Sequence, residues 1–177
     1  MNQTRVSKEQ FLNSLSVRYM IRRDIPEVLE IEWASFAYPL TEEDFLHNLR
    51  QGNCIGTVAE HGEKVVGFMI YESHKYKFHI LNFAVHSLYR RGGVGSYMVM
   101  RLIGMLPHPL CTRRITLEVR ETNLLAQLFF RSRGFKAVKV LPRFYEDSGE
   151  DAYLMQYQLG PEVINAEKES FRDYFDE

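Results

Sequence analysis

The stretch "LYRRGGVGSYMVMRLIGML", residues 88–106, places two arginines and three glycines before a long apolar run whose only charge is Arg101. This order predicts a strand-to-helix turn followed by a helix over about 93–106. Backbone N–H groups at the start of a helix have no partners within the helix, and the helix dipole adds partial positive charge there. The stretch therefore predicts an anion-binding turn, with a pyrophosphate as the expected guest, on a helix buried against a sheet.

Three phosphate-binding patterns compete for this turn. A Walker loop needs Gly-Lys-Ser/Thr, and the stretch has no lysine, so that pattern is excluded. A dinucleotide fingerprint begins at Gly93 and Gly95 and finds a ribose-binding acid in Glu118, but Met98 stands at its third glycine. The third pattern, Arg/Gln-x-x-Gly-x-Gly/Ala, is met by Arg90, Gly93 and Gly95. A turn that uses its glycines for structural reasons alone remains an alternative.

Length and composition indicate one domain of ordinary size with a substantial core, since the 177 residues are 45% hydrophobic. The 22 basic and 23 acidic residues leave a net charge of -1, so no overall field draws the chain to nucleic acid or to a membrane. The sequence has no membrane-span pattern and no secretory signal, and we expect a cytoplasmic protein. Cys54 and Cys111 have no zinc-like spacing, so we expect structural thiols and no metal site.

The hydrophobic pattern predicts an α+β chain in the order β-αα-βββ-α-β-α-ββ. Asp24 is expected to cap the first of the paired helices, and Thr41 with Asp44 resembles a capping box for the second. Short connections predict an antiparallel meander for the three central strands. The expected organisation is an N-terminal extension (1–16) with a short helix, one domain (17–160) and an acidic tail (161–177).

Four segments in order resemble one enzyme family. They are the Arg90–Gly95 pattern, "NFAV" before it, "LEVRETN" (117–123) and "LFFRSRGF" (128–135). Over roughly 17–160 the chain resembles the GNAT superfamily of acyl-CoA-dependent N-acyltransferases. The resemblance implies a three-layer fold with a mixed, mostly antiparallel central sheet flanked by helices, and acetyl-CoA as the cofactor.

The resemblance also implies a division of labour around the cofactor. The strand ahead of the turn would pair its backbone with the pantetheine arm, the turn would cradle the pyrophosphate, and Asn123 would both cap its helix and contact the cofactor near its reactive end. The implied cofactor residues are Phe83, Ala84, Val85, Arg90, Arg91, Gly92, Gly93, Val94, Gly95, Ser96 and Asn123.

A narrower likeness is to the ribosomal-protein-alanine and other protein N-terminal acetyltransferases. It rests on "SFAYPLTEEDF" (35–45), "LEVRETN" and "RFYEDSGEDAYLM" (143–155), the last with one residue more than the usual ending. It implies that Phe36, Pro39 and Tyr145 surround a peptide, and that a protein or peptide N-terminus, with a ribosomal protein as one candidate, accepts the acetyl group. Direct attack in a ternary complex is the implied mechanism. Neither nucleic acid nor membrane is expected as a partner, and the chain would be a monomer or dimer.

Acetyl transfer needs a neutral amine and a group that takes its proton. An α-amine with a pKa near 8 costs roughly 1 kcal/mol to deprotonate at pH 7, against roughly 4 to 5 kcal/mol for a lysine. Glu118 is the expected base because the resemblance implies that the glutamate of the "LEVR" strand faces the amine. Alternation along the strand also places Thr116, Glu118 and Arg120 on one face. A solvated surface glutamate is the alternative.

Some residues depart from the family pattern. Phe130 stands where the relatives carry the tyrosine that protonates the CoA thiolate, so water or Tyr145 replaces it, or the thiolate leaves unassisted. His86 and Gly92 replace the usual acid and glutamine around the turn, and neither change affects the phosphate argument. Two other functions stay open: a GNAT acetyltransferase for a small amine or a lysine, and a non-catalytic acyl-CoA-binding module.

Overall fold

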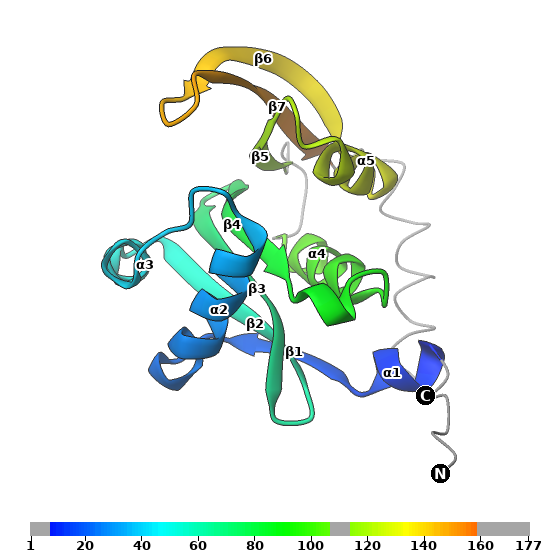
Figure 1. Cartoon of the computed structure of the whole chain (residues 1–177). Helices are drawn as coiled ribbons and strands as arrows, with labels where there is room; N and C mark the ends of the chain where they lie inside the picture. The colour runs from blue at the N-terminus through cyan, green and yellow to red at the C-terminus, as the bar shows by residue number, and fades with distance from the viewer. Residues whose placement is uncertain (1–7, 107–113, 159–177) are drawn as a thin grey trace. The chain divides into compact units, whose positions relative to one another are not determined.

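The computed structural model describes residues 8–106 and 114–158 (Figure 1). These residues divide into two compact units. The first contains residues 8–74 and 79–105, and the second contains residues 75–78, 106 and 114–158.

The first unit contains a four-stranded sheet in the order β1-β2-β3-β4, in which β1 pairs antiparallel with β2 and β2 with β3. Helices α2 and α4 lie on opposite faces of this sheet (Figure 1). Its elements are α1 (Lys8–Asn13), β1 (Leu15–Tyr19), the 3₁₀ turn η1 (Arg22–Asp24), α2 (Ile25–Ser35), α3 (Glu42–Arg50), β2 (Cys54–His61), β3 (Lys64–His74), β4 (Lys77–Val85), the 3₁₀ turn η2 (Ser87–Tyr89) and α4 (Val94–Gly104).

The second unit contains a three-stranded antiparallel sheet in the order β5-β7-β6, with one helix before β6. Strand β6 leaves regular register between Leu141 and Tyr145, where Arg143 adopts a left-handed φ of 49°. Such a bulge bends a strand and redirects the side chains beyond it. The elements are β5 (Arg114–Arg120), α5 (Leu124–Ser132), β6 (Lys136–Tyr145) and β7 (Glu150–Gln158).

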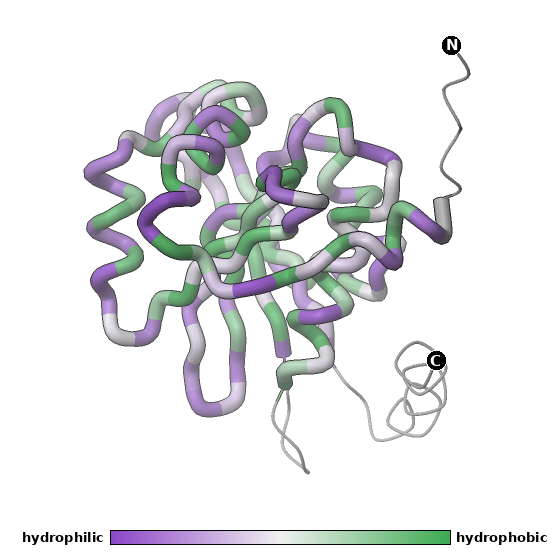
Figure 2. Tube along the Cα trace, turned by 90° about the horizontal axis from the view of Figure 1, so that it is seen from below, coloured by the Kyte–Doolittle hydropathy of each residue, from purple (hydrophilic) through white to green (hydrophobic). Residues whose placement is uncertain are grey.

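The core of the first unit forms where α2 and α3 cover the sheet. Phe45 from α3 is fully buried and meets Phe68 of β3 edge-to-face, with ring centroids 5.5 Å apart. Figure 2 shows hydrophobic residues along the central strands and hydrophilic ones along the connections. On the other face, a Cβ at Gly67 of β3 would lie only 3.3 Å from Met98 Sδ and 3.4 Å from Val94 Cγ1. Helix α4 is therefore packed closely on the sheet, as its apolar sequence predicts.

The predicted order of helices and strands is confirmed, α1 is the short helix predicted in the N-terminal extension, and two 3₁₀ turns are additional. The Thr41–Asp44 capping box is also confirmed. Asp24 occupies the N-cap position of α2, but its side chain makes no capping bond there. Its buried carboxylate accepts hydrogen bonds from both Arg18 Nη atoms, at 2.7 and 2.9 Å, and from Ile21 N. The Asp24 carboxylate pairs with Arg18 instead of capping α2, because a buried carboxylate without a cation is costly.

A second buried carboxylate, Glu32, ties the connection after α2 to the sheet. The residue is 1% exposed; Leu40 N donates to its Oε1 at 2.9 Å, and Asn82 Nδ2 of β4 donates to its Oε2 at 2.8 Å. Burial raises the pKa of Glu32, and these two hydrogen bonds oppose the rise. Through Glu32, the α2–α3 connection is therefore held at Leu40 and tied to Asn82 of β4.

Substituting Glu32→Gln tests this tie. Glutamine can keep both contacts if Asn82 rotates its amide, and it cannot ionise. Because the folded chain raises the pKa of Glu32, its contribution to stability is full below the ordinary carboxyl pKa and decreases as pH rises through the raised value. In urea titrations we therefore expect the difference in unfolding free energy, Glu32→Gln minus wild type, to be larger at about pH 8 than at about pH 4.

The matched variant is Glu32→Met, which leaves Leu40 N and the Asn82 amide without this partner. We expect it to lose about 2–4 kcal/mol of unfolding free energy at both pH values. A difference between wild type and Glu32→Gln that does not vary with pH would contradict the expectation.

Candidate active site

The glycine turn precedes α4 in the first unit. Gly93 has a φ of 101° and Arg91 a φ of 64°, so two left-handed residues bend the chain before Val94. Tyr97 N donates to Gly93 O at 2.9 Å, which begins the helical hydrogen bonds. The amides of residues 94–96 come before that bond and have no acceptor within the helix. The turn thus has the geometry of an anion site at a helix start.

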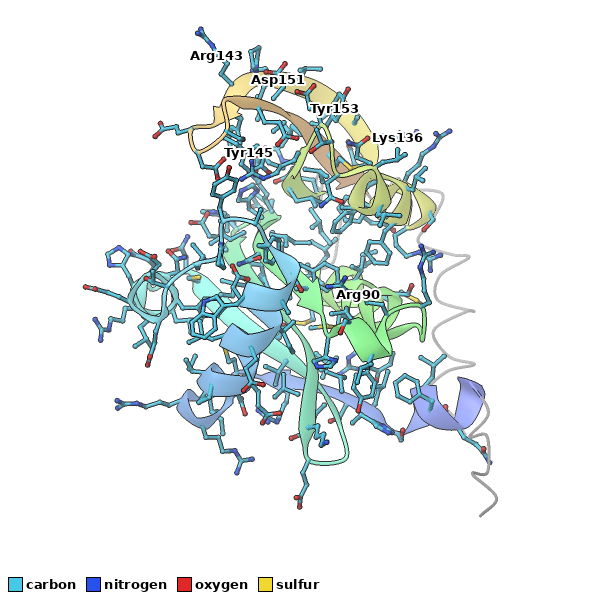
Figure 3. All side chains as sticks on the ribbon, viewed as in Figure 1. Arg90, Lys136, Arg143, Tyr145, Asp151 and Tyr153 are labelled. Atoms are coloured by element: carbon cyan, nitrogen blue, oxygen red, sulfur yellow. The ribbon has the colours of Figure 1, made fainter. Side chains whose placement is uncertain are left out.

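Arg90 and Arg91 differ in their surroundings. The Arg90 Nε donates to Val85 O, and its Nη2 donates to Ser35 Oγ, both at 2.9 Å (Figure 3). Arg90 therefore fastens the turn to the end of β4 and to α2. Arg91 is exposed. The sequence predicted cofactor contact for both; their contacts favour a fastening role for Arg90 and leave Arg91 to supply charge at the surface.

The end of β4 lies next to this turn in the chain, as predicted. Ala84 is buried, and its carbonyl oxygen would be 3.1 Å from a Cβ at Gly67 of β3. His86 N donates to Val66 O at 2.9 Å, so β4 stays attached to β3 up to the turn. Within the first unit, the structure brings together the ten predicted cofactor residues Phe83, Ala84, Val85, Arg90, Arg91, Gly92, Gly93, Val94, Gly95 and Ser96.

In the second unit, Arg120 organises the loop between β6 and β7. Its guanidinium carbon lies 3.8 Å from the centroid of the Tyr145 ring. Its Nη atoms donate to both carboxylate oxygens of Asp147, and Nη1 also donates to Glu150 Oε2 at 3.3 Å. We call Arg120, Tyr145, Asp147 and Glu150 the Arg120 cluster. It holds Tyr145, at the loop end of β6 (Figure 3), by stacking and by charge-assisted hydrogen bonds.

The charges of this cluster set the protonation of its members. Burial raises the pKa of Tyr145 to about 12, with Glu118, Glu150 and Asp147 adding to the rise and Arg120 opposing it. The hydrogen bond from Arg120 lowers the pKa of Asp147, and hydrogen bonds from Thr122 and then Arg120 lower that of Glu150. Tyr145 is therefore a neutral phenol at physiological pH, in the electrostatic reach of the Glu118 carboxylate.

Glu118, one of the two predicted catalytic residues, lies two residues before Arg120 on β5, and its charge adds to the rise in the pKa of Tyr145, the other. The prediction had named neither Asp147 nor Glu150, and Arg120 only as a residue on the Glu118 face. Alternation along β5 was the signal that pointed to Arg120. Asp147 lies between β6 and β7 and Glu150 begins β7, and no local pattern in the chain indicated that the two would meet Arg120.

Helix α5 carries the other two predicted positions in this unit. Asn123 caps the helix, because its Oδ1 accepts from Ala126 N at 3.1 Å, and this part of the prediction is confirmed. Its contact with a cofactor stays a prediction. Phe130 is 4% exposed and packs against Phe129 and Phe135, with centroids 5.0 and 5.2 Å away. Phe130 is therefore a core residue of the second unit.

The predicted acceptor residues of the first unit lie on the α2–α3 connection. Phe36 is half-buried and packs against the core, whereas Pro39 is exposed. Glu32 fixes this connection through Leu40, a role that sequence reasoning missed although an acid among the apolar residues of α2 was visible. The connection therefore presents Pro39 on a backbone that the core holds in place.

Other predicted features are simple to place. Cys54 is half-buried, and burial raises the pKa of its thiol. In the described ranges no group of three or more His, Cys, Asp or Glu residues is arranged to hold a metal ion. Across the same ranges, the helices are too short or too polar for one of them to span a bilayer. Cys111 and the tail 161–177 lie outside the described residues.

Comparison with known proteins now identifies the family. Residues 25–135 match the Acetyltransferase (GNAT) family. An uncharacterised N-acetyltransferase of Methanocaldococcus jannaschii is 34% identical over 140 residues, which cover 78% of this chain and 88% of the relative.

Two solved structures agree with that match. The structure of Ard1 from Thermoplasma volcanium superposes with a TM-score of 0.74 at 27% identity, covering 83% of this chain and 99% of that one. The ribosomal-protein-S18-alanine N-acetyltransferase from Escherichia coli gives a TM-score of 0.72 at 25% identity, over 83% and 97% of the chains. The predicted fold class is thereby confirmed. The chain belongs to the GNAT family and is an acetyl-CoA-dependent N-acetyltransferase.

Proposed function

We propose that this enzyme transfers the acetyl group of acetyl-CoA to the N-terminal α-amino group of a protein or peptide, by direct attack in a ternary complex. The observation that carries the proposal is the Arg120 cluster, in which Arg120, two residues beyond Glu118 on β5, lies on the ring of a neutral Tyr145, on the segments that resemble N-terminal acetyltransferases. The similarity to a ribosomal-protein-S18-alanine N-acetyltransferase supports the same acceptor class.

The two residues take complementary parts in the reaction. Glu118 removes the proton of the incoming amine, directly or through one water, as the nitrogen attacks the thioester carbonyl. The carbon–sulfur bond then breaks, and CoA leaves as a thiolate that takes up a proton. Tyr145 keeps its proton throughout, because its pKa is raised to about 12, so it donates a hydrogen bond to the peptide while the departing thiolate takes its proton from water.

The cofactor would be held through its diphosphate. In this proposal the amides of residues 94–96 receive the phosphate oxygens, and Arg91 adds charge beside them. The backbone of residues 83–85 would pair with the pantetheine arm, and Asn123 would reach the cofactor close to its thioester. Arg90 would contribute by holding the turn through Val85 and Ser35, a contact that the first unit already contains.

A small amine or a lysine is the alternative acceptor. One carboxylate is a modest base, which suits an α-amine with a pKa near 8 better than a lysine near 10.4. The binding module that the sequence left open rested on Phe130, which has no proton to donate, and the family match sets it aside.

The deciding experiment follows acetyl-CoA consumption with four groups of acceptor. Peptides with free Ala, Ser, Met and Thr starts should be acetylated, whereas lysine peptides with blocked N-termini and polyamines should react at least about tenfold more slowly. Preference for a blocked lysine peptide or a polyamine would move the assignment to the alternative acceptors. Silence with every acceptor, while CoA still binds, would contradict the proposed acceptor class.

The variant Glu118→Gln tests the base. It keeps the size of the side chain but cannot accept a proton, and we expect kcat to fall by about 10²- to 10⁴-fold at neutral pH. Calorimetric affinity for acetyl-CoA should change by less than about threefold. Part of the loss should be recovered as pH rises past about 8, because more of the amine is then neutral without help. Full activity of the variant at pH 7 would contradict the role of Glu118.

The variant Asp147→Asn tests the Arg120 cluster. It removes the charge that holds both Nη atoms of Arg120, so Tyr145 loses its fixed position. We expect the KM for peptide to rise about three- to tenfold with the KM for acetyl-CoA unchanged. The matched control is Glu146→Gln, which removes one exposed negative charge from the same loop and should leave both constants unchanged. Equal effects of the two variants would show that only the charge of the loop matters.

A further inference from the structure

The segment before β1 lies against the glycine turn of the first unit. A Cβ at Gly93 would stand 2.9 Å from Leu12 Cδ2, and one at Gly92 would stand 3.2 Å from Phe11 Cε1. Phe11 and Leu12 are both half-buried at these contacts. Figure 1 likewise draws α1 close to the start of α4. The two glycines therefore leave room for side chains of α1 on the outer side of the turn.

Aromatic rings of β2 and η2 also contact Phe11. The Phe11 ring stacks on Tyr89 of η2, with centroids 6.1 Å apart and planes at 18°, and it meets His61 of β2 at 4.8 Å. Tyr89 also lies 5.6 Å from the His86 ring. Ser14 Oγ hydrogen-bonds His61 Nδ1 at 2.8 Å, which anchors the end of α1 to β2. We call Phe11, Leu12, His61 and Tyr89 the turn buttress.

The turn needs such support because its backbone is strained. Arg91 is not glycine, yet its φ of 64° lies in the left-handed region, where other residues cost on the order of 1 kcal/mol or more. A conformation of this kind persists only where its surroundings hold it. Binding of an anion by backbone amides is strongest when those amides are placed before the ligand arrives. A side chain that fixes the turn therefore contributes to affinity without touching the ligand.

We propose that Phe11 and Leu12 are positioning residues for acetyl-CoA, which hold the turn of residues 91–93 in the geometry that receives the cofactor diphosphate. This inference rests on the proposed seat of the diphosphate at residues 94–96. It gives the N-terminal segment a part in cofactor binding, whereas the sequence alone had suggested an appendage. It also gives Gly93 a second reason to be glycine besides its left-handed φ, because a side chain there would displace Leu12, and it explains Gly92, where a Cβ would crowd Tyr89 O and Phe11.

The test compares two thioesters in the full-length enzyme. Acetyl-CoA carries the diphosphate, and acetyl-pantetheine does not. In Phe11→Ala and in Leu12→Ala we expect the KM for acetyl-CoA and the calorimetric Kd for CoA to rise about five- to thirtyfold. The efficiency kcat/KM with acetyl-pantetheine, the peptide KM, and kcat at saturating acetyl-CoA should stay within about twofold of wild type. The matched control is Leu88→Ala, whose side chain is 84% exposed beside the turn and should change none of these values.

Other outcomes overturn the proposal. Equal losses with both thioesters would mean that the residues serve the fold in general, and an unchanged or tighter Kd for CoA would mean that the turn does not need them. Thermal unfolding without cofactor checks that each variant is folded; if Phe11→Ala is not, Leu12→Ala and the conservative Phe11→Leu decide. The variant Arg91→Glu tests the diphosphate site at residues 94–96 separately from the role of Phe11 and Leu12. If this variant leaves the CoA affinity of the enzyme intact, the diphosphate lies elsewhere.

Discussion

The arrangement of the first unit depends on one constraint: backbone amides at the start of α4 must face outward from a helix that is itself buried. A buried helix can offer its N-terminal amides only if the chain turns sharply before it, and the left-handed Gly93 makes that turn. The close packing of Met98 and Val94 over Gly67 then holds the helix in place. Arg90 ties the same turn to β4 and to α2. The turn thus presents main-chain amides, and the side chains of Arg90, Val94 and Met98 hold it in place.

In the second unit, the phenol of Tyr145 is kept neutral and held in place beside the carboxylates of Asp147 and Glu150. Tyr145 follows the irregular part of β6, and the guanidinium of Arg120 lies on its ring while also binding the neighbouring acids. Burial and the negative charges both favour the protonated phenol. One arginine therefore serves geometry and electrostatics together, since it orders the loop and balances the acids that surround the tyrosine.

Sequence reasoning reached the parts of this architecture that depend on local rules. The glycine turn, the capping box of Thr41 and the cap at Asn123 follow from neighbours in the chain, and the structure confirms each of them. Contacts between distant segments were not visible. Asn82 hydrogen-bonds Glu32, fifty positions earlier in the chain, and the Phe11 ring stacks on Tyr89, which is also far from it in sequence. Such pairs depend on tertiary packing, for which a single sequence carries no periodic signal.

The pairing of Glu32 with Asn82 has an evolutionary consequence. Each side chain satisfies the other where little water can replace a lost partner, and Glu32 in turn holds the backbone of the loop at Leu40. Selection therefore acts on the two positions as a unit: a substitution at one survives best when the other changes with it. Across many descendants of this gene, positions 32 and 82 should covary, while the loop between α2 and α3 keeps its path and diversifies only at its outward side chains.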